Sequence, residues 1–329
     1  AGYGWTNALI AATMPVLVFW LARAMKFGAW AGAGAAGLLA VWLTGLDQRF
    51  LHPDHYRWLF LAAITIPVWR SRLEWSYKVG WVCFAFLTML ATYGPVWLGF
   101  RIIGWLPGRT ASVMTLFLIP ALAMAFLAKG RLTWMIGAFG LGLLALGSYE
   151  QSVMIPFLYL ALALAARPKL EKTMWQMVAG FAVSVAMYLA LRVALVPSRV
   201  SGYQDQQLRF GPGVWVSQAD YLLLPYGPYQ SLRSLMEFGF NALIVADFWT
   251  SFGMLVVTVW AWVWLARTQN PRRVLALMAA SWLAFLPMSF LKMFEHYHLL
   301  PMALRALMVV AMAEVVLAAG AGVAAQGVV

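Results

Sequence analysis

Long apolar runs separated by short polar stretches make up most of the chain. Such runs predict membrane-spanning helices, because a crossing helix needs about 20 apolar residues and because backbone groups left unpaired in hydrocarbon are costly. The run at 58–69 is short for a crossing, so we expect it to be tilted, extended or re-entrant. We expect helices at about 5–24, 28–46, 58–69, 79–97, 111–128, 132–149, 151–166, 174–194, 247–266, 274–291 and 299–318.

The pattern predicts an all-α fold, a polytopic transmembrane bundle of about 10 to 12 helices in a single domain over residues 1–329. The longest polar stretch, 195–246, opens as a loop and continues with aromatic and aliphatic residues mixed with isolated polar ones, which is typical of interfacial helices. We expect one external loop region there, which is either a lid on the membrane surface or an amphipathic connector.

Composition supports the membrane class. Hydrophobic residues make up 64% of the chain, charged residues 10%, and the mean hydropathy is +0.79. A soluble globule could not cover so much apolar surface. The net charge of +12 comes from Lys and Arg in short loops, not from one basic domain, so we expect membrane lipids as partners and no nucleic acid. The single cysteine, Cys83, excludes an intrachain disulfide.

The basic residues alternate with the predicted helices. Those at 23–26, 70–78, 129–131, 167–172 and 267–273 fall on one side of the bundle, which the positive-inside rule assigns to the cytoplasm. Eight of the eleven carboxylates then fall on the opposite side. We therefore expect an integral protein of a bacterial inner membrane, with its functional face external or periplasmic.

A tight external turn holds Glu150 between two strongly apolar runs, with Pro156 six residues later. An ionised carboxylate so close to hydrocarbon needs a partner or water. Glu150 therefore either faces a polar cavity or complements the dipole of the helix that follows it.

A second external turn repeats this acid-to-proline spacing in the sequence Glu295-His296-Tyr297-His298-Leu299-Leu300-Pro301. Its imidazoles and phenol, with Arg305 one to two turns into the next helix, suit a phosphate or a hydroxyl-rich ligand. Alternate residues of a helix point to different faces, so His296 and His298 do not predict a metal site. A third external motif, Leu51-His52-Pro53-Asp54-His55, is a turn that presents two imidazoles.

These motifs together resemble those of the C-type (GT-C) integral-membrane glycosyltransferases, especially the protein O-mannosyltransferases and the transmembrane and tetratricopeptide-containing mannosyltransferases. The Ser148-Tyr149-Glu150 turn is similar to the family's Ser-Lys-Glu turn, with Tyr149 in the place of lysine. The segment from Glu295 to Pro301 resembles the family's late Glu-Arg-Tyr-x-Tyr-x-Pro motif, with His296 in the place of arginine.

Two further stretches carry the likeness. The Leu51 to His55 turn matches a typical Leu-His-Pro-x-His turn, and the run from Tyr188 to Arg192 looks like the helix end before the family's large external loop. The 5–20 run resembles the family's second helix, and no Asp or Glu precedes Asp47. The resemblance therefore implies either a first helix and an acidic loop upstream of Ala1, with which the absence of an initiator Met agrees, or a protein that is not a working transferase.

The resemblance implies transfer of a sugar from a polyprenyl-phosphate donor to an acceptor hydroxyl on the non-cytoplasmic side. The lipid-linked sugar is the donor substrate and no other cofactor and no metal is expected; either a protein acceptor or a larger membrane complex is a further partner. The implied catalytic residues are Glu150, Asp54 and Glu295, and the implied residues for the donor phosphate or substrate are Arg192, His296, His298, Arg305 and His55.

A non-catalytic, degenerate subunit of a larger membrane complex is the alternative. The predicted spans place almost no ionisable group near the membrane midplane, which argues against an ion-coupled transporter.

Overall fold

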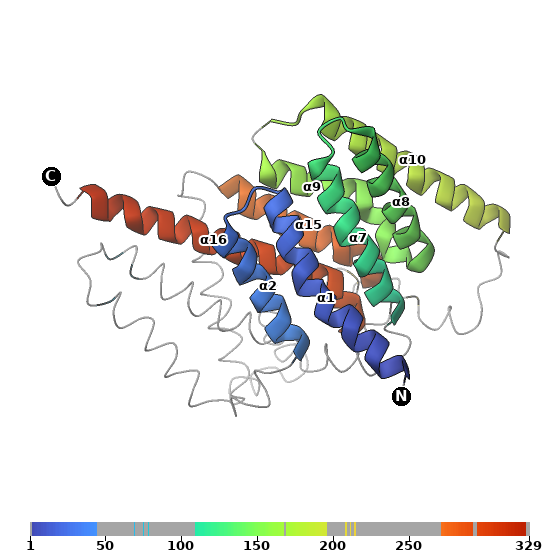
Figure 1. Ribbon diagram of the computed structural model, residues 1–329, viewed down its shortest axis with the longest axis horizontal. Coiled ribbons are helices and arrows are strands. Elements are labelled where there is room, and N and C mark those ends of the chain that lie inside the picture. Colours follow the sequence, from blue (N-terminus) through green and yellow to red (C-terminus); the bar gives the residue numbers. More distant parts are fainter. Residues whose placement is uncertain are drawn as a thin grey trace.

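The computed structural model describes residues 2–44, 109–167, 169–195, 271–291 and 295–326, together with the single residues 69, 75, 78, 208, 211 and 214. Over these residues the chain is helical and contains no strand, only an isolated bridge (Figure 1). Its α-helices are α1 (Gly2–Ala24), α2 (Ala29–Thr44), α7 (Arg109–Leu127), α8 (Leu132–Ser148), α9 (Ile155–Ala166), α10 (Lys172–Leu195), α15 (Pro271–Phe285) and α16 (Leu299–Gln326). Three short 3-10 helices accompany them: η2 (Glu150–Met154), η4 (Leu286–Phe290) and η5 (Glu295–His298).

The all-α prediction is confirmed for this part of the chain, and each described helix coincides with a predicted apolar run. Four of the helical stretches are long and apolar enough to cross a membrane: Trp5–Ala24, Arg109–Leu127, Lys172–Leu195 and Arg272–Phe290. Shorter apolar helices of 10 to 17 residues accompany them. The runs predicted at 58–69, 79–97 and 247–266 lie, apart from Trp69, outside the described residues.

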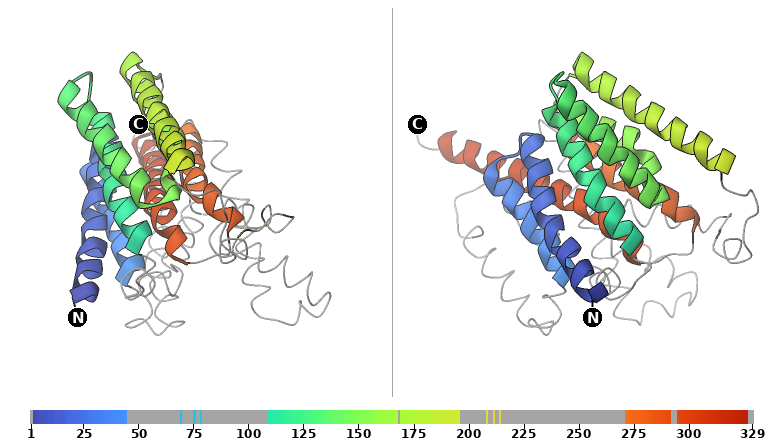
Figure 2. Two further views of the ribbon diagram at one scale, coloured as in Figure 1. Left: turned by 90° about the vertical axis from the view of Figure 1, so that its right-hand side faces the viewer. Right: turned by 45° about the vertical axis from the view of Figure 1, so that its right-hand side comes forward.

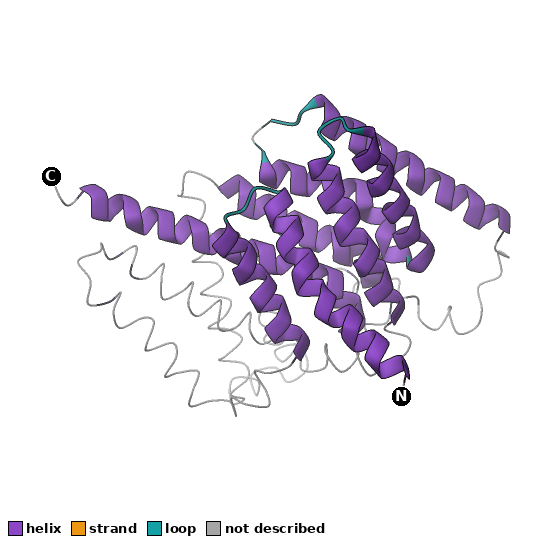
Figure 3. Cartoon of the chain, viewed as in Figure 1, coloured by secondary structure: helices purple, strands orange, loops and turns teal. Residues whose placement is uncertain are grey.

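Short turns make neighbouring helices run in opposite directions. The loops between α1 and α2, between α7 and α8 and between α9 and α10 lie on the upper side of the view in Figure 3. The turn at 128–131 uses Gly130 with a φ of 81°, a left-handed conformation that glycine adopts without steric cost. A Cβ added at Gly130 would lie 3.8 Å from Thr173 Cγ2 in the first turn of α10, so these two turns are neighbours.

Positive charge gathers where these turns meet. We call this region the basic end; it comprises the turns at 24–28, 128–131 and 167–171 and the start of α15 at Arg272 and Arg273. Lys26, Arg167, Arg272 and Arg273 line one cavity there, although they come from three separate parts of the chain. The sequence predicted that these basic loops share one side, and the structure brings them together.

The opposite end of the bundle follows from the chain direction. Helix α8 leaves the basic end at Arg131 and finishes at Ser148, whereas α9 returns from Ile155 to Arg167. Helix α15 runs away from Arg273, and α16 comes back to Glu314, which accepts a hydrogen bond of 2.9 Å from Arg273. We call the region formed by η2, η4 and η5 the Glu150 end.

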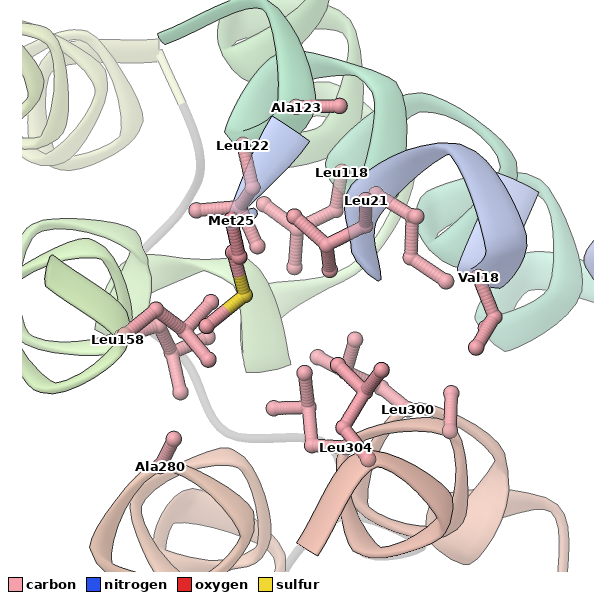
Figure 4. Packing of buried hydrophobic residues seen from close by; sticks show 14 of the residues in the cluster. Val18, Leu21, Met25, Leu118, Leu122, Ala123, Leu158, Ala280, Leu300 and Leu304 are labelled. Atoms are coloured by element: carbon pink, nitrogen blue, oxygen red, sulfur yellow. The ribbon is translucent and has the colours of Figure 1, made fainter. Parts of the chain in front are cut away.

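The core lies where α1, α7, α9, α15 and α16 converge. Figure 4 shows Met25 reaching toward Leu158, with Leu118 and Leu122 on one side and Leu304 on the other. These side chains are at most 1% exposed. Lipid tails are as apolar as the core, so close packing contributes more than burial to helix association in a membrane.

Helix α10 lies at the outer edge of the described bundle in Figure 1 and in the right-hand view of Figure 2. Only 6% of its apolar window is buried. It touches the bundle through Phe181, whose ring packs edge-to-face against Phe139 of α8 with centroids 5.3 Å apart. Met174, Met177 and Ser184 are also buried, and the opposite face of the helix presents an apolar surface that lipid or another protein would cover.

Close approach of α10 to α8 generates a stability prediction. A Cβ on Gly180 would overlap the Phe139 ring, which Phe181 holds in place, whereas a Cβ on Gly137 would meet only the flexible end of Met124. We expect Gly180→Ala to lower the free energy of unfolding by about 1–3 kcal/mol through overpacking.

The matched variant Gly137→Ala should be neutral or stabilising, because Met124 can move and alanine gains up to about 1 kcal/mol of helix propensity. Thermal unfolding in detergent measures both variants. Equal melting temperatures for the two would contradict the described packing of α10 on α8.

Candidate functional site

Gln151 joins three segments at the Glu150 end. Its side-chain Nε2 donates to the backbone oxygen of Ala284 at 2.6 Å and to that of Tyr297 at 3.1 Å. Ala284 lies in the last turn of α15, where carbonyl groups lack a partner within the helix. One buried amide therefore caps α15 and ties η2 to η5, so the two acid-to-proline turns of the sequence are neighbours in space.

The Gln151 amide is oriented so that its acceptor oxygen, Oε1, is buried in the interior of the protein. The Nε2 atom faces two carbonyl oxygens, which only a donor can do, so the opposite atom is Oε1. Among the described residues Oε1 of Gln151 is buried and has no hydrogen-bond partner, and the same holds for Nε1 of Trp282, which packs beside Tyr297. One buried acceptor and one buried donor at this end thus have no hydrogen-bond partner among the described residues.

Aromatic rings line the junction between the turns. Tyr149 and Tyr297 are stacked, with centroids 6.1 Å apart and an interplanar angle of 27°. His298 stacks on Phe285 at the end of α15, with centroids 5.3 Å apart. Tyr149 takes an extended conformation between α8 and η2, and its carbonyl accepts a hydrogen bond of 2.7 Å from the Ser152 hydroxyl, which fixes the turn.

Tyr149 lies in the turn between two apolar helices and keeps its proton at neutral pH. Burial raises the pKa of its phenol above the usual value of 10.0, and Tyr297 and the Glu150 carboxylate raise it further. A neutral phenol can donate a hydrogen bond to an anionic or hydroxyl-rich ligand.

Glu150 forms an ion pair with Arg192 of α10. The same guanidinium donates from Nη1 to the Tyr188 hydroxyl at 2.9 Å. Side-chain exposure is 51% for Glu150 and 38% for Arg192, so water reaches both groups and the pair contributes little to stability. The pairing nevertheless holds a carboxylate and a guanidinium side by side at the surface of the Glu150 end.

The long segment at 195–246 reaches this end at one described point. Leu208 forms an antiparallel bridge with Leu291, which follows η4 directly. Leu291 packs against the small cluster formed by Phe285, Met288 and Tyr297. The remainder of 195–246, apart from Leu195, Gly211 and Val214, lies outside the described residues.

The sequence-predicted site residues divide into four groups, of which Arg305 alone forms the last. Glu150, Arg192 and His298 lie at the Glu150 end, two of them in the ion pair and the third in a ring stack. Glu295 and His296 belong to η5, whose backbone is described although these two side chains are not. Asp54 and His55 lie outside the described residues.

Arg305 is buried within the bundle. It is 5% exposed and lies on α16, about two turns after His298. A buried guanidinium is costly unless hydrogen-bonded or paired, and ionisable groups inside membrane helices usually mark functional positions. Its burial separates it from the surface pair of Glu150 and Arg192.

The sequence alone did not single out Gln151, Phe285 or Trp282. Gln151 looked like a polar residue next to a carboxylate, and its role depends on carbonyls that lie far away in the sequence. The hydrogen bond between Tyr188 and Arg192 could have been predicted from the sequence, because residues four apart on a helix are neighbours.

Comparison of the chain with protein families, with curated proteins and with solved structures finds no match.

Gln151 provides a test of how the Glu150 end is held together. Gln151→Met keeps the length of the side chain but removes both donated hydrogen bonds, which leaves two buried carbonyl groups without their partner. We expect a loss of about 1–3 kcal/mol in the free energy of unfolding.

Ser148→Ala is the matched control, because among the described residues the Ser148 hydroxyl donates to Leu144 O within its own helix. It should change the melting temperature little. A Gln151→Met variant as stable as the wild type would refute the bridging role.

The pKa shift of Tyr149 predicts a pH dependence of stability. As the pH rises above about 10, the unfolded phenol loses its proton while the folded phenol keeps it, so the unfolded state binds fewer protons and the free energy of unfolding falls. Tyr149→Phe should make this alkaline decline shallower by up to about 1.4 kcal/mol per pH unit. Unfolding followed from pH 7 to 11 measures the slope, and identical slopes for the variant and the wild type would contradict the shift.

Proposed function

We propose that this chain is an integral-membrane glycosyltransferase of the C-type kind, which transfers a sugar from a polyprenyl-phosphate donor to an acceptor hydroxyl at the Glu150 end. One observation carries the proposal. The two acid-to-proline turns that resemble the family's motifs pack against each other through Gln151, at the end opposite the basic loops.

Charge supports an orientation in which the Glu150 end faces away from the cytoplasm. Lysine and arginine near the ends of membrane helices favour the cytoplasmic side. Lys26, Arg167, Arg272 and Arg273 meet at the basic end. The lipid-linked donor would then enter the Glu150 end from the outer leaflet of a bacterial inner membrane.

Arg192 suits the binding of the donor phosphate. A guanidinium has five N–H donors, and only two of its nitrogens have partners described here, the Glu150 carboxylate and the Tyr188 hydroxyl. Arg192 can therefore donate hydrogen bonds to phosphate oxygens while it stays paired with Glu150. The neutral phenol of Tyr149 and the orphan groups of Gln151 and Trp282 add hydrogen-bonding capacity for sugar hydroxyls.

The proposed reaction is a substitution at the anomeric carbon. The acceptor oxygen forms a bond to that carbon, the bond from the carbon to the lipid-phosphate oxygen breaks, and the lipid phosphate departs with the bonding electrons. The acceptor proton passes to a carboxylate, for which Glu150, Glu295 and Asp54 are the candidates, and nearby cations stabilise the departing phosphate. His55, His296, His298 and Arg305 are the further candidates for binding the donor phosphate or the substrate.

A non-catalytic membrane subunit is the second candidate, and the exposed face of α10 favours it. Val183, Met187, Leu191 and Val193 are 56–83% exposed in this chain alone. A partner helix that covered this face would make α10 an assembly surface.

A transfer assay with full-length protein and a polyprenyl-phosphate sugar tests the proposal. We expect Glu150→Gln and Arg192→Gln each to lower the transfer rate by about 10²- to 10⁴-fold, the range for loss of an acid–base group or of a donor to developing charge. Glu171→Gln is the matched control, because Glu171 is also an exposed glutamate paired with an arginine, Arg167, but lies at the basic end.

Full activity in Glu150→Gln and Glu295→Gln would refute the transferase proposal. Absence of transfer by the wild type, together with a partner that copurifies in a fixed ratio, would support the subunit instead.

A further inference from the structure

The basic end contains a cavity of about 270 Å³ that the proposed reaction does not use. Its polar lining consists of Lys26 after α1, Arg167 after α9, and Arg272 and Arg273 at the start of α15. Met25 and Leu164 supply much of its apolar wall. Among the described residues that line it there is no carboxylate.

We propose that this cavity binds a phosphate-bearing anion. Four cationic side chains line one small volume and no carboxylate is among its described lining residues, so the surroundings of the cavity favour an anion. Phosphate matches the set, because its oxygens accept several charge-assisted hydrogen bonds from guanidinium and ammonium groups at once. Basic pockets between membrane helices on the cytoplasmic side bind lipid head groups in the same way.

The position of Arg272 and Arg273 supports an anion. Both lie in the first turn of α15, where the helix dipole is positive and disfavours cations. Lys26 and Arg167 follow the C-termini of α1 and α9, where the helix dipole stabilises cations. Arg272 and Arg273 lie at a helix N-terminus and gain no such stabilisation. An anion bound there would meet the guanidinium groups at the positive end of the helix dipole.

Neighbouring groups hold two of the cations in position. The Arg273 guanidinium lies 3.7 Å from the centre of the Phe27 ring and 2.9 Å from the Glu314 carboxylate. Arg167 pairs with Glu171 in the following turn. Both arginines line the cavity, whereas neither carboxylate does.

Lys26 occupies a backbone position that ordinarily takes glycine. Its φ is 67°, and the turn carries the two hydrogen bonds of a Schellman motif, from Lys26 N to Arg23 O at 3.0 Å and from Phe27 N to Ala22 O at 2.9 Å. A lysine is strained there relative to glycine. Lys26 is exposed and lines the cavity. Binding of an anion there would account for a lysine at a backbone position that favours glycine.

Ligand-dependent stability of the full-length protein in a zwitterionic detergent tests the site. The probes are phosphatidylglycerol, phosphatidylcholine and inorganic phosphate, each titrated while the melting temperature is followed, since a ligand that binds the folded state raises it. We expect phosphatidylglycerol or inorganic phosphate to raise the melting temperature and phosphatidylcholine not to do so. Which of the two anions acts identifies the source of the phosphate group.

Two variants separate the site from general surface charge. Lys26→Gly removes one cation and relieves the strained φ, so the ligand-free protein should melt no lower than the wild type while anion affinity falls roughly fivefold, as about 1 kcal/mol per cation implies. Lys26→Gln with Arg272→Gln should weaken binding further, by at least about tenfold.

The matched control is Lys129→Gln with Arg131→Gln, which removes two exposed charges from the same end but not from the cavity. It should keep wild-type affinity. Equal loss in this control, or no selective effect of either anion, would overturn the proposal. The site lies at the opposite end from Glu150, so this result does not depend on whether the chain transfers sugar.

Discussion

The arrangement of the Glu150 end depends on one side chain, the buried amide of Gln151. Its two hydrogen bonds reach a carbonyl at the end of α15 and a carbonyl in η5, and they hold the turn that carries Glu150 against the turn that carries Glu295. A buried donor is costly when it lacks an acceptor, so the amide fixes the relative position of these turns strongly. The stacked rings of Tyr149 and Tyr297 and the bridge from Leu208 to Leu291 lie around the same junction.

Charge divides the bundle into two ends with different chemistry. At the Glu150 end a half-exposed carboxylate and guanidinium lie beside neutral phenols and unsatisfied buried polar atoms. At the basic end cations outnumber carboxylates around a cavity. The two regions lie at opposite ends of the same helices. The concentration of cations at one of these ends supports both the proposed orientation in the membrane and the proposed anion site, and leaves the other end for the proposed transfer reaction.

Sequence alone predicted the helices well, because a continuous apolar run can satisfy its backbone in a membrane only as a helix. The polar residues around Glu150 predicted the end of α8, but α9 begins at Ile155, four residues later than predicted, because Glu150–Met154 form the 3-10 helix η2. The partners within the site could not be predicted in this way. The contact of Glu150 with Arg192 joins two helices, and the contacts of Gln151 depend on carbonyl groups that every residue carries. Tertiary packing decides such contacts, and one sequence contains no direct record of it.

Membrane sidedness is the claim on which the transferase account rests, and the two ends of α8 measure it most directly. Single cysteines at Ser148 and at Arg131, in a chain whose Cys83 is replaced by serine, would be labelled with a membrane-impermeant maleimide in sealed right-side-out vesicles. The account predicts that Ser148→Cys reacts from outside and that Arg131→Cys reacts only after the membrane is opened. Labelling of Arg131→Cys from outside, or of both cysteines from the same side, would contradict it.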